Sequence, residues 1–205
     1  MSDPAAPCTP AEALQRLKAG NDRFVRGEAK FPTVQESVLA HLKQGQHPFA
    51  TILSCSDSRV PPELVFDADL GELFVIRVAG NVLGPAVTGT LEYAAAHLHT
   101  PLFVVMGHEN CGAVSAAIDS RVKGAKLEKR ISVLLENILP ALDDVDLGAP
   151  PEKRLHDAVE ANVRRTMRVL RESPEGAALM GKGAVRLVGA VYDLDTGRVE
   201  FLDER

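Results

Sequence analysis

Two short clusters, about fifty residues apart, carry the side chains best suited to chemistry. They are Cys55-Ser56-Asp57-Ser58-Arg59 and Gly107-His108-Glu109-Asn110-Cys111-Gly112. Thiolate and imidazole groups suit Zn²⁺, and three protein ligands leave the fourth tetrahedral position for a reacting water molecule. We therefore interpret Cys55, His108 and Cys111 as the ligands of a catalytic zinc ion.

Each cluster directly follows a short apolar run. The runs are Phe49-Ala50-Thr51-Ile52-Leu53 and Leu102-Phe103-Val104-Val105-Met106, so both clusters should lie where a buried strand opens into a loop. Parallel α/β sheets carry their chemistry at this edge. The three-residue spacing of His108 and Cys111 places both on one side of a turn that leads into a helix. We expect Gly112 to leave the backbone room for a close approach there.

Other interpretations of the three side chains remain possible. A single cysteine or histidine is more often a buried thiol or a loop histidine than a metal ligand. The occurrence of three such residues directly after strands favours the metal site. A thiol-redox role is weakened because the chain has no Cys-x-x-Cys motif. We assign no role to Cys8.

Asp57 is either a fourth metal ligand or a group beside the open metal position. Arg59 favours the second role, because a guanidinium can hold a carboxylate through two hydrogen bonds and lower its pKa. Asp57 would then accept a hydrogen bond from the zinc-bound hydroxide and aim its lone pair at the substrate. The alternative is a structural ion pair that closes a turn.

The composition predicts a single α/β domain with a small-molecule partner. The chain has 205 residues and 45% hydrophobic content, enough for one sizeable core. Its net charge of −5 without a dense basic run argues against nucleic acid or an anionic membrane as the main partner. With no signal peptide or membrane span apparent, we expect a cytoplasmic location, where three cysteines are poor material for disulfides.

The spacing of apolar residues predicts the elements. Predicted strands cover 49–53, 73–78 and 102–106, with a C-terminal hairpin of 185–192 and 199–202. Predicted helices cover 10–25, with a capping box at Thr9, then 38–42, 87–98, 127–138, which Pro140 should end, and 155–170.

This order predicts a central, mostly parallel sheet flanked by helices. We expect about four parallel strands and an antiparallel C-terminal edge strand. Residues 1–205 form one domain in this interpretation. It comprises a flexible leader (1–8), an N-terminal helical arm (9–45) and the α/β core (46–205).

With these residues in hand, the chain resembles a β-class carbonic anhydrase from about Ala11 to Leu202. The resemblance is carried by Cys55-Ser-Asp57-Ser-Arg59-Val-Pro, by His108-x-x-Cys111-Gly, and by intervening segments. Those segments are Phe74-Val-Ile-Arg-Val-Ala-Gly-Asn81 and Gly89-Thr-Leu-Glu-Tyr93-Ala. The resemblance implies zinc on Cys55, His108 and Cys111, and a catalytic pair of Asp57 and Arg59. The family reaction is the reversible hydration of carbon dioxide to bicarbonate and a proton by a zinc-bound hydroxide.

The resemblance also implies a small, partly apolar substrate pocket at a subunit interface, and so a homodimer or homotetramer. Gln46 matches the amide that donates a hydrogen bond to the substrate, and Phe74 and Tyr93 match the aromatic wall. Gly112 matches the glycine after the last ligand, whereas Ala79 stands where some members carry valine.

Three questions stay open at the sequence level. The chain contains no tryptophan, which together with Gln46 favours the subgroup whose site stays open at lower pH. The candidate proton carriers are His41, His47, His97 and His99. Alternative functions are hydrolysis of an analogue such as carbon disulfide, or a catalytically silent, zinc-stabilised protein that senses bicarbonate or binds a partner.

Overall fold

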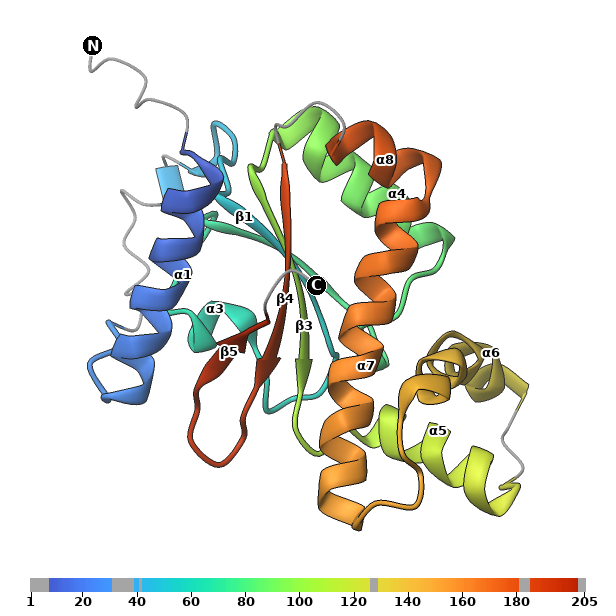
Figure 1. Ribbon diagram of the computed structural model, residues 1–205. Helices are drawn as coiled ribbons and strands as arrows, with labels where there is room; N and C mark the ends of the chain where they lie inside the picture. Colours follow the sequence, from blue (N-terminus) through green and yellow to red (C-terminus); the bar gives the residue numbers. More distant parts are fainter. Residues whose placement is uncertain (1–7, 31–38, 41, 126–128, 181–184, 203–205) are drawn as a thin grey trace.

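A five-stranded sheet in the order β2-β1-β3-β4-β5 forms the centre of the protein (Figure 1). The computed structural model describes residues 8–30, 39–40, 42–125, 129–180 and 185–202. The strands are β1 (Ala50–Ser54), β2 (Leu73–Arg77), β3 (Leu102–His108), β4 (Arg186–Tyr192) and β5 (Val199–Phe201). The first four run parallel and β5 pairs antiparallel with β4, which confirms the predicted fold class.

The two strands that precede the chemical clusters are neighbours in this sheet. Residues Thr51–Ser54 of β1 pair in parallel register with Phe103–Met106 of β3. Both strands are buried along their whole length. Such near-continuous apolar runs are typical of strands that are covered on both faces. Parallel pairing brings the carboxyl ends of β1 and β3 to the same edge of the sheet.

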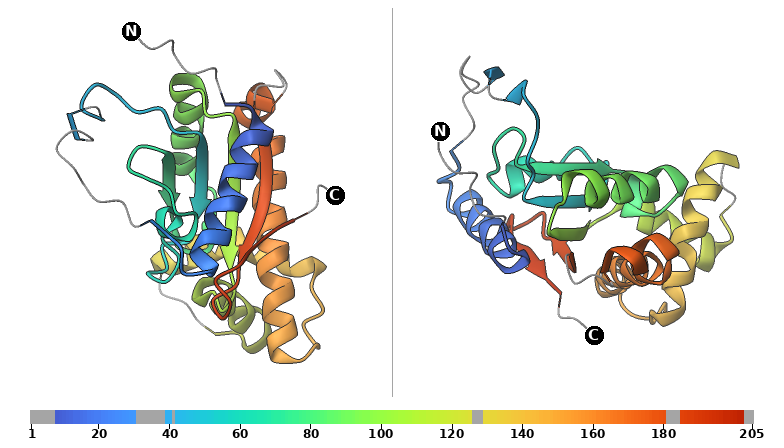
Figure 2. Two further views of the ribbon diagram at one scale, coloured as in Figure 1. Left: turned by 90° about the vertical axis from the view of Figure 1, so that its left-hand side faces the viewer. Right: turned by 90° about the horizontal axis from the view of Figure 1, so that it is seen from above.

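Helices and helical turns connect the strands. They are α1 (Pro10–Val25), α3 (Pro62–Val65), η1 (Ala79–Asn81), α4 (Pro85–Tyr93), η2 (Ala94–Leu98), α5 (Gly112–Lys123), α6 (Lys129–Ile138), η3 (Leu139–Asp144), α7 (Pro151–Glu172) and α8 (Pro174–Met180). The longest of them, α7, packs against β3 and β4, and the hairpin of β4 and β5 separates it from α1 (Figures 1 and 2).

Local signals in the sequence explain several helix ends. The capping box at the start of α1 is present, with Glu12 N–H donating to Thr9 Oγ1 at 3.3 Å and Thr9 N–H donating to Glu12 Oε2 at 2.8 Å. The α-helix α6 ends at Ile138, two residues before Pro140, as expected for a residue that cannot continue a helix.

The sequence missed other helical features. The helix predicted over 87–98 is α-helical only to Tyr93 and continues as a π-helix. The helices α3 and α8 are too short to show a clear period. Of the helix predicted over 38–42, residues 39, 40 and 42 are helical, and 38 and 41 lie outside the described residues. None of the helices in the described part of the chain is both long and apolar enough to cross a membrane.

Candidate metal centre

The two chemical clusters meet at the carboxyl ends of β1 and β3. Cys55 directly follows β1, His108 is the last residue of β3, and Cys111 is the residue before α5. The ligand atoms that these three side chains offer all lie within 4.8 Å of one another. All three side chains are buried. The strand-end rule therefore correctly predicted that these residues come together.

The ring of His108 is oriented as a metal ligand requires. Its Nδ1 lies 2.8 Å from the backbone oxygen of Glu109, which can only accept a hydrogen bond, so Nδ1 carries the proton. Nε2 then has a free lone pair, and this buried atom has no hydrogen-bond partner within the described chain. A buried, unpaired imidazole nitrogen beside two free thiols fits a borderline-soft cation such as Zn²⁺.

Hydrogen bonds favour ionisation within the thiol pair. Cys55 accepts a hydrogen bond from Cys111 and one from the Gly80 N–H, and these bonds lower the pKa of Cys55 although burial opposes them. The Gly80 nitrogen lies 3.3 Å from Cys55 Sγ. The pKa of Cys111 is raised, because Cys111 keeps its proton to donate a hydrogen bond to Cys55 and is itself buried. The first thiolate thus forms readily, as a metal ligand must.

Asp57 is held by Arg59 at the border of this group. Arg59 donates from Nε to Oδ1 at 2.9 Å and from Nη2 to Oδ2 at 2.8 Å, and its backbone N–H donates to Oδ1 at 3.0 Å. These bonds lower the pKa of Asp57 far below the usual range for a carboxyl, although burial opposes them. Asp57 Oδ2 lies 3.9 Å from His108 Nε2. An ionised carboxylate therefore stands beside the candidate ligands.

Comparison with known proteins decides the family. A family model described as carbonic anhydrase matches residues 50–199. Carbonic anhydrase 2 of Mycobacterium tuberculosis (strain ATCC 25618 / H37Rv) is 38% identical over 197 residues, which cover 95% of this chain and 93% of that protein. The chain belongs to the β-carbonic anhydrase family.

Solved structures of β-carbonic anhydrases share the fold. The β-carbonic anhydrase CcaA has a TM-score of 0.75 and 28% sequence identity, and the match covers 93% of this chain and 95% of that chain. The Coccomyxa β-carbonic anhydrase in complex with acetazolamide has a TM-score of 0.75 and 26% identity, with 93% of this chain and 86% of that chain covered. The resemblance inferred from the motifs is thereby confirmed.

In this β-carbonic anhydrase, the residues predicted to bind substrate fall into two separate groups. Ala79 and Gly112 adjoin the candidate ligands, since Ala79 precedes Gly80 and Gly112 follows Cys111. Gln46 lies before the start of β1, whereas Cys55 directly follows its last residue, so the two lie at opposite ends of this strand. Among the described residues, no atom beyond the chain neighbours and the backbone of its own helix lies within 4 Å of a Cβ built on Gly112.

The aromatic residues belong to the second group. The rings of Phe74 and Tyr93 have centroids 6.2 Å apart, and Tyr93 is 48% exposed. Phe74 is paired in register with Thr51, four residues before Cys55 along an extended strand. At about 3.3 Å per residue this is a separation of roughly 13 Å. The aromatic wall therefore does not face the candidate metal ligands of its own chain.

Three of the four candidate proton carriers lie at the surface. His47, His97 and His99 are exposed, and His41 lies outside the described residues. His97 packs on Tyr93 with ring centroids 5.0 Å apart.

Sequence reasoning missed Arg77, which braces the loop that carries Cys55 and Asp57. Arg77 Nε donates to the backbone oxygen of Cys55 at 3.0 Å, and Nη2 donates to the backbone oxygen of Asp57. Arg77 stands inside one of the segments that carried the family resemblance, so a signal was present. A role for it could not be derived from spacing, because the contact crosses from β2 to the end of β1.

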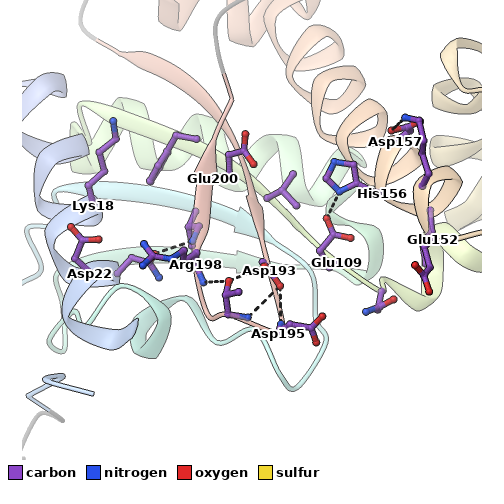
Figure 3. A pocket seen from close by; sticks show the side chains of 18 residues that line it. Lys18, Asp22, Glu109, Glu152, His156, Asp157, Asp193, Asp195, Arg198 and Glu200 are labelled. Atoms are coloured by element: carbon purple, nitrogen blue, oxygen red, sulfur yellow. Dashed lines mark hydrogen bonds and ion pairs between the residues drawn. The ribbon is translucent and has the colours of Figure 1, made fainter. Parts of the chain in front are cut away.

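The loop between His108 and Cys111 is braced from the other side. His156 of α7 lies with Nδ1 2.6 Å from Glu109 Oε1. Figure 3 shows this contact in an open groove between α1, the β4–β5 hairpin and the start of α7. The two residues are 47 positions apart, and the sequence offered no signal that connects them.

Proposed function

We propose that this enzyme catalyses the reversible hydration of carbon dioxide to bicarbonate and a proton, with Zn²⁺ held by Cys55, His108 and Cys111. The observation that carries the proposal is the buried, unpaired Nε2 of His108 between two thiols, with the ionised Asp57 beside it. When bound, zinc supplies a Lewis acid that makes a water molecule nucleophilic at near-neutral pH.

Asp57 is suited to orient the attacking water. Its Oδ1 accepts two hydrogen bonds, from the backbone N–H and the Nε of Arg59, while Oδ2 accepts one, from Arg59 Nη2. A carboxylate oxygen has room for two hydrogen bonds, so a lone pair of Oδ2 remains for a donor on the side of His108. Asp57 Oδ2 thus accepts the hydrogen bond of the water and turns the water's lone pair toward carbon dioxide.

Arg59 keeps Asp57 in this role. The two-pronged bond fixes the plane of the carboxylate and keeps it ionised, so Asp57 serves as an acceptor and does not donate a proton. The same bond fixes Asp57 in place, so Asp57 would stand beside a bound metal and would not ligate it. This arrangement supports the open form of the site that the absence of tryptophan favours.

The substrate pocket in this proposal is completed by a second copy of the chain. Gln46, Phe74 and Tyr93 lie away from the ligands of their own chain, and Tyr93 is half exposed. In a symmetric dimer the same surface patch of each protomer meets its partner. In such a dimer, the candidate ligands of each protomer would be covered by Gln46, Phe74 and Tyr93 of the partner subunit. The unit of activity is then a homodimer or a homotetramer.

The test is a stopped-flow assay of carbon dioxide hydration combined with metal analysis of the same protein. We expect stoichiometric zinc, and we expect Asp57→Asn to retain the zinc while kcat/KM falls by about 10²- to 10³-fold. The matched control is Asp143→Asn, which breaks an exposed ion pair with Arg121 of 3.0 Å and should leave turnover unchanged. Zinc retained without turnover in the wild type would refute the proposed reaction.

A further inference from the structure

A buried asparagine on α7 contacts the backbone next to the candidate ligand Cys55. Asn162 is 1% exposed, and its Nδ2 donates to the backbone oxygen of Gly80 at 2.8 Å. Gly80 in turn donates its N–H to Cys55 Sγ at 3.3 Å. The helix lies close to the ligands at a second point, because a Cβ on Gly107, the residue before His108, would be 2.7 Å from Val163.

The backbone at Gly80 needs such support. Its φ is +69°, in the left-handed region, and a Cβ built there would lie 2.7 Å from Ile138 Cδ1. Glycine is therefore required at this position, and glycine is also the residue with the widest choice of backbone conformations. The hydrogen bond from Asn162 fixes the carbonyl of Gly80, and with it the conformation that aims the N–H at the sulfur.

The direction of this N–H affects the metal. A hydrogen bond to a thiolate draws electron density from the sulfur, so the thiolate gives less charge to a bound cation. Groups that contact metal ligands tune the metal in this way. Two thiolates make zinc a weaker Lewis acid than three neutral imidazoles would, and the Gly80 N–H offsets part of this effect at Cys55.

We infer that Asn162 is a positioning residue for the reaction: through Gly80 it maintains the hydrogen bond that withdraws charge from the Cys55 thiolate and so keeps the bound metal acidic. This inference rests on the proposed metal site. Asn162 makes no hydrogen bond to Cys55, His108 or Cys111 in the described structure. Its Oδ1 has no hydrogen-bond partner within the described chain, so the bond to Gly80 is the one polar contact that the described structure gives this side chain.

The experiment compares Asn162→Leu with the wild type. Leucine has a similar volume but cannot donate to Gly80. In protein loaded with Cd²⁺, we expect the thiolate-to-metal charge-transfer band to move to lower energy, because the sulfur becomes richer in electrons. In the zinc enzyme, we expect kcat/KM at neutral pH to fall about 10-fold and the loss to shrink at alkaline pH, since the acid limb of the profile moves upward.

The matched control is another buried asparagine. Asn21 of α1 is 5% exposed and donates to the backbone oxygens of Val65 and Gly197 at 3.1 and 2.9 Å. The variant Asn21→Leu should lower the stability of the fold while leaving the band energy and the shape of the pH profile unchanged. If Asn162→Leu does not fold, Asn162→Ser serves in its place, because its hydroxyl is too short to reach Gly80.

An unshifted charge-transfer band in a folded, cadmium-loaded Asn162 variant overturns the inference, as does a wild type that binds no Cd²⁺. A shifted band in a protein that does not hydrate carbon dioxide would support the positioning role and refute the proposed function, so the two failures can be told apart.

Discussion

The guanidinium of Arg59 grips the carboxylate of Asp57 through both oxygens, with distances of 2.9 Å from Nε to Oδ1 and 2.8 Å from Nη2 to Oδ2. This contact keeps Asp57 ionised and fixed as a hydrogen-bond acceptor. Without it, the carboxylate would be free to rotate onto a bound metal.

Replacing Arg59 by lysine should impair turnover and change its pH dependence. Lysine offers a single point charge and cannot reproduce the two-pronged bond, so we expect kcat/KM to fall about 10- to 100-fold. Because Arg59 lowers the pKa of Asp57, the wild-type carboxylate stays ionised until the pH is well below the usual value near 3.9. In Arg59→Lys that pKa rises toward its usual value, so the deficit should grow as the pH is lowered toward 4.

The measurement is kcat/KM from pH 4 to 9 for both proteins. Arg121→Lys, which alters the exposed pair with Asp143, is the control and should follow the wild-type curve. A wild-type profile that collapses steeply and cooperatively between mildly alkaline and neutral pH would contradict the open site. A constant ratio between Arg59→Lys and wild type would contradict the role given to the Asp57 pKa.

Mixed oligomers should show whether the pocket needs two chains. Asp57→Asn removes the carboxylate beside the candidate ligands, and Gln46→Ala removes the amide that the partner contributes in this proposal. In a heterodimer of these variants one site carries both defects and the other carries none. Random co-assembly should therefore restore about a quarter of the wild-type activity per chain. The control is a mixture of the two separately purified homo-oligomers under conditions in which they do not exchange subunits. Co-assembly without recovery would place both halves of the site in one chain.

Removal of the metal should expose the two buried thiols and lower the thermal stability. All three cysteines are free, and Cys55 and Cys111 are buried, whereas Cys8 is partly exposed. A colorimetric thiol reagent should react rapidly with one cysteine per chain in the zinc protein and with three after chelation. A metal present at 1,000 times its dissociation constant stabilises the fold by about 4 kcal/mol, so Tm should drop on chelation and recover with zinc. Equal thiol reactivity before and after chelation would argue against ligation by cysteine.

The packing of α1 depends on the absence of a side chain at Gly20. A Cβ there would lie 1.8 Å from the backbone oxygen of Phe66, which cannot move as a flexible side chain can. We expect Gly20→Ala to lower the free energy of unfolding by about 2 kcal/mol, measured by urea denaturation. Gln15→Ala, at an exposed position of the same helix, should change it by less than about 0.5 kcal/mol. Equal stability of the two variants would show that α1 can shift without cost.

The sequence predicted those features that depend on local pattern. Continuous apolar runs gave the buried strands, and the rule that parallel sheets carry chemistry at their carboxyl edge brought Cys55, His108 and Cys111 together. Contacts between distant segments could not be predicted. Neither Asn162 nor His156 stands near a ligand in the sequence, and only the packing of α7 brings them to the ligand loops.

The close approach expected at Gly112 stays a prediction, because local spacing does not say what faces a glycine. The separation of Gln46 and Phe74 from Cys55 follows from strand register. It became visible only when the direction and pairing of β1 and β2 were known.

The candidate ligands lie at the ends of two adjacent strands, β1 and β3, yet the chain passes through β2 and several helical turns between these strands. During synthesis, Cys55 is therefore made before His108 and Cys111. The N-terminal segment alone lacks these two donors and cannot retain a metal ion with native affinity. A metal ion can bind with native affinity only after the segment between β1 and β3 has folded and the two strands have paired. Metal content therefore reports whether a molecule has reached its correct topology.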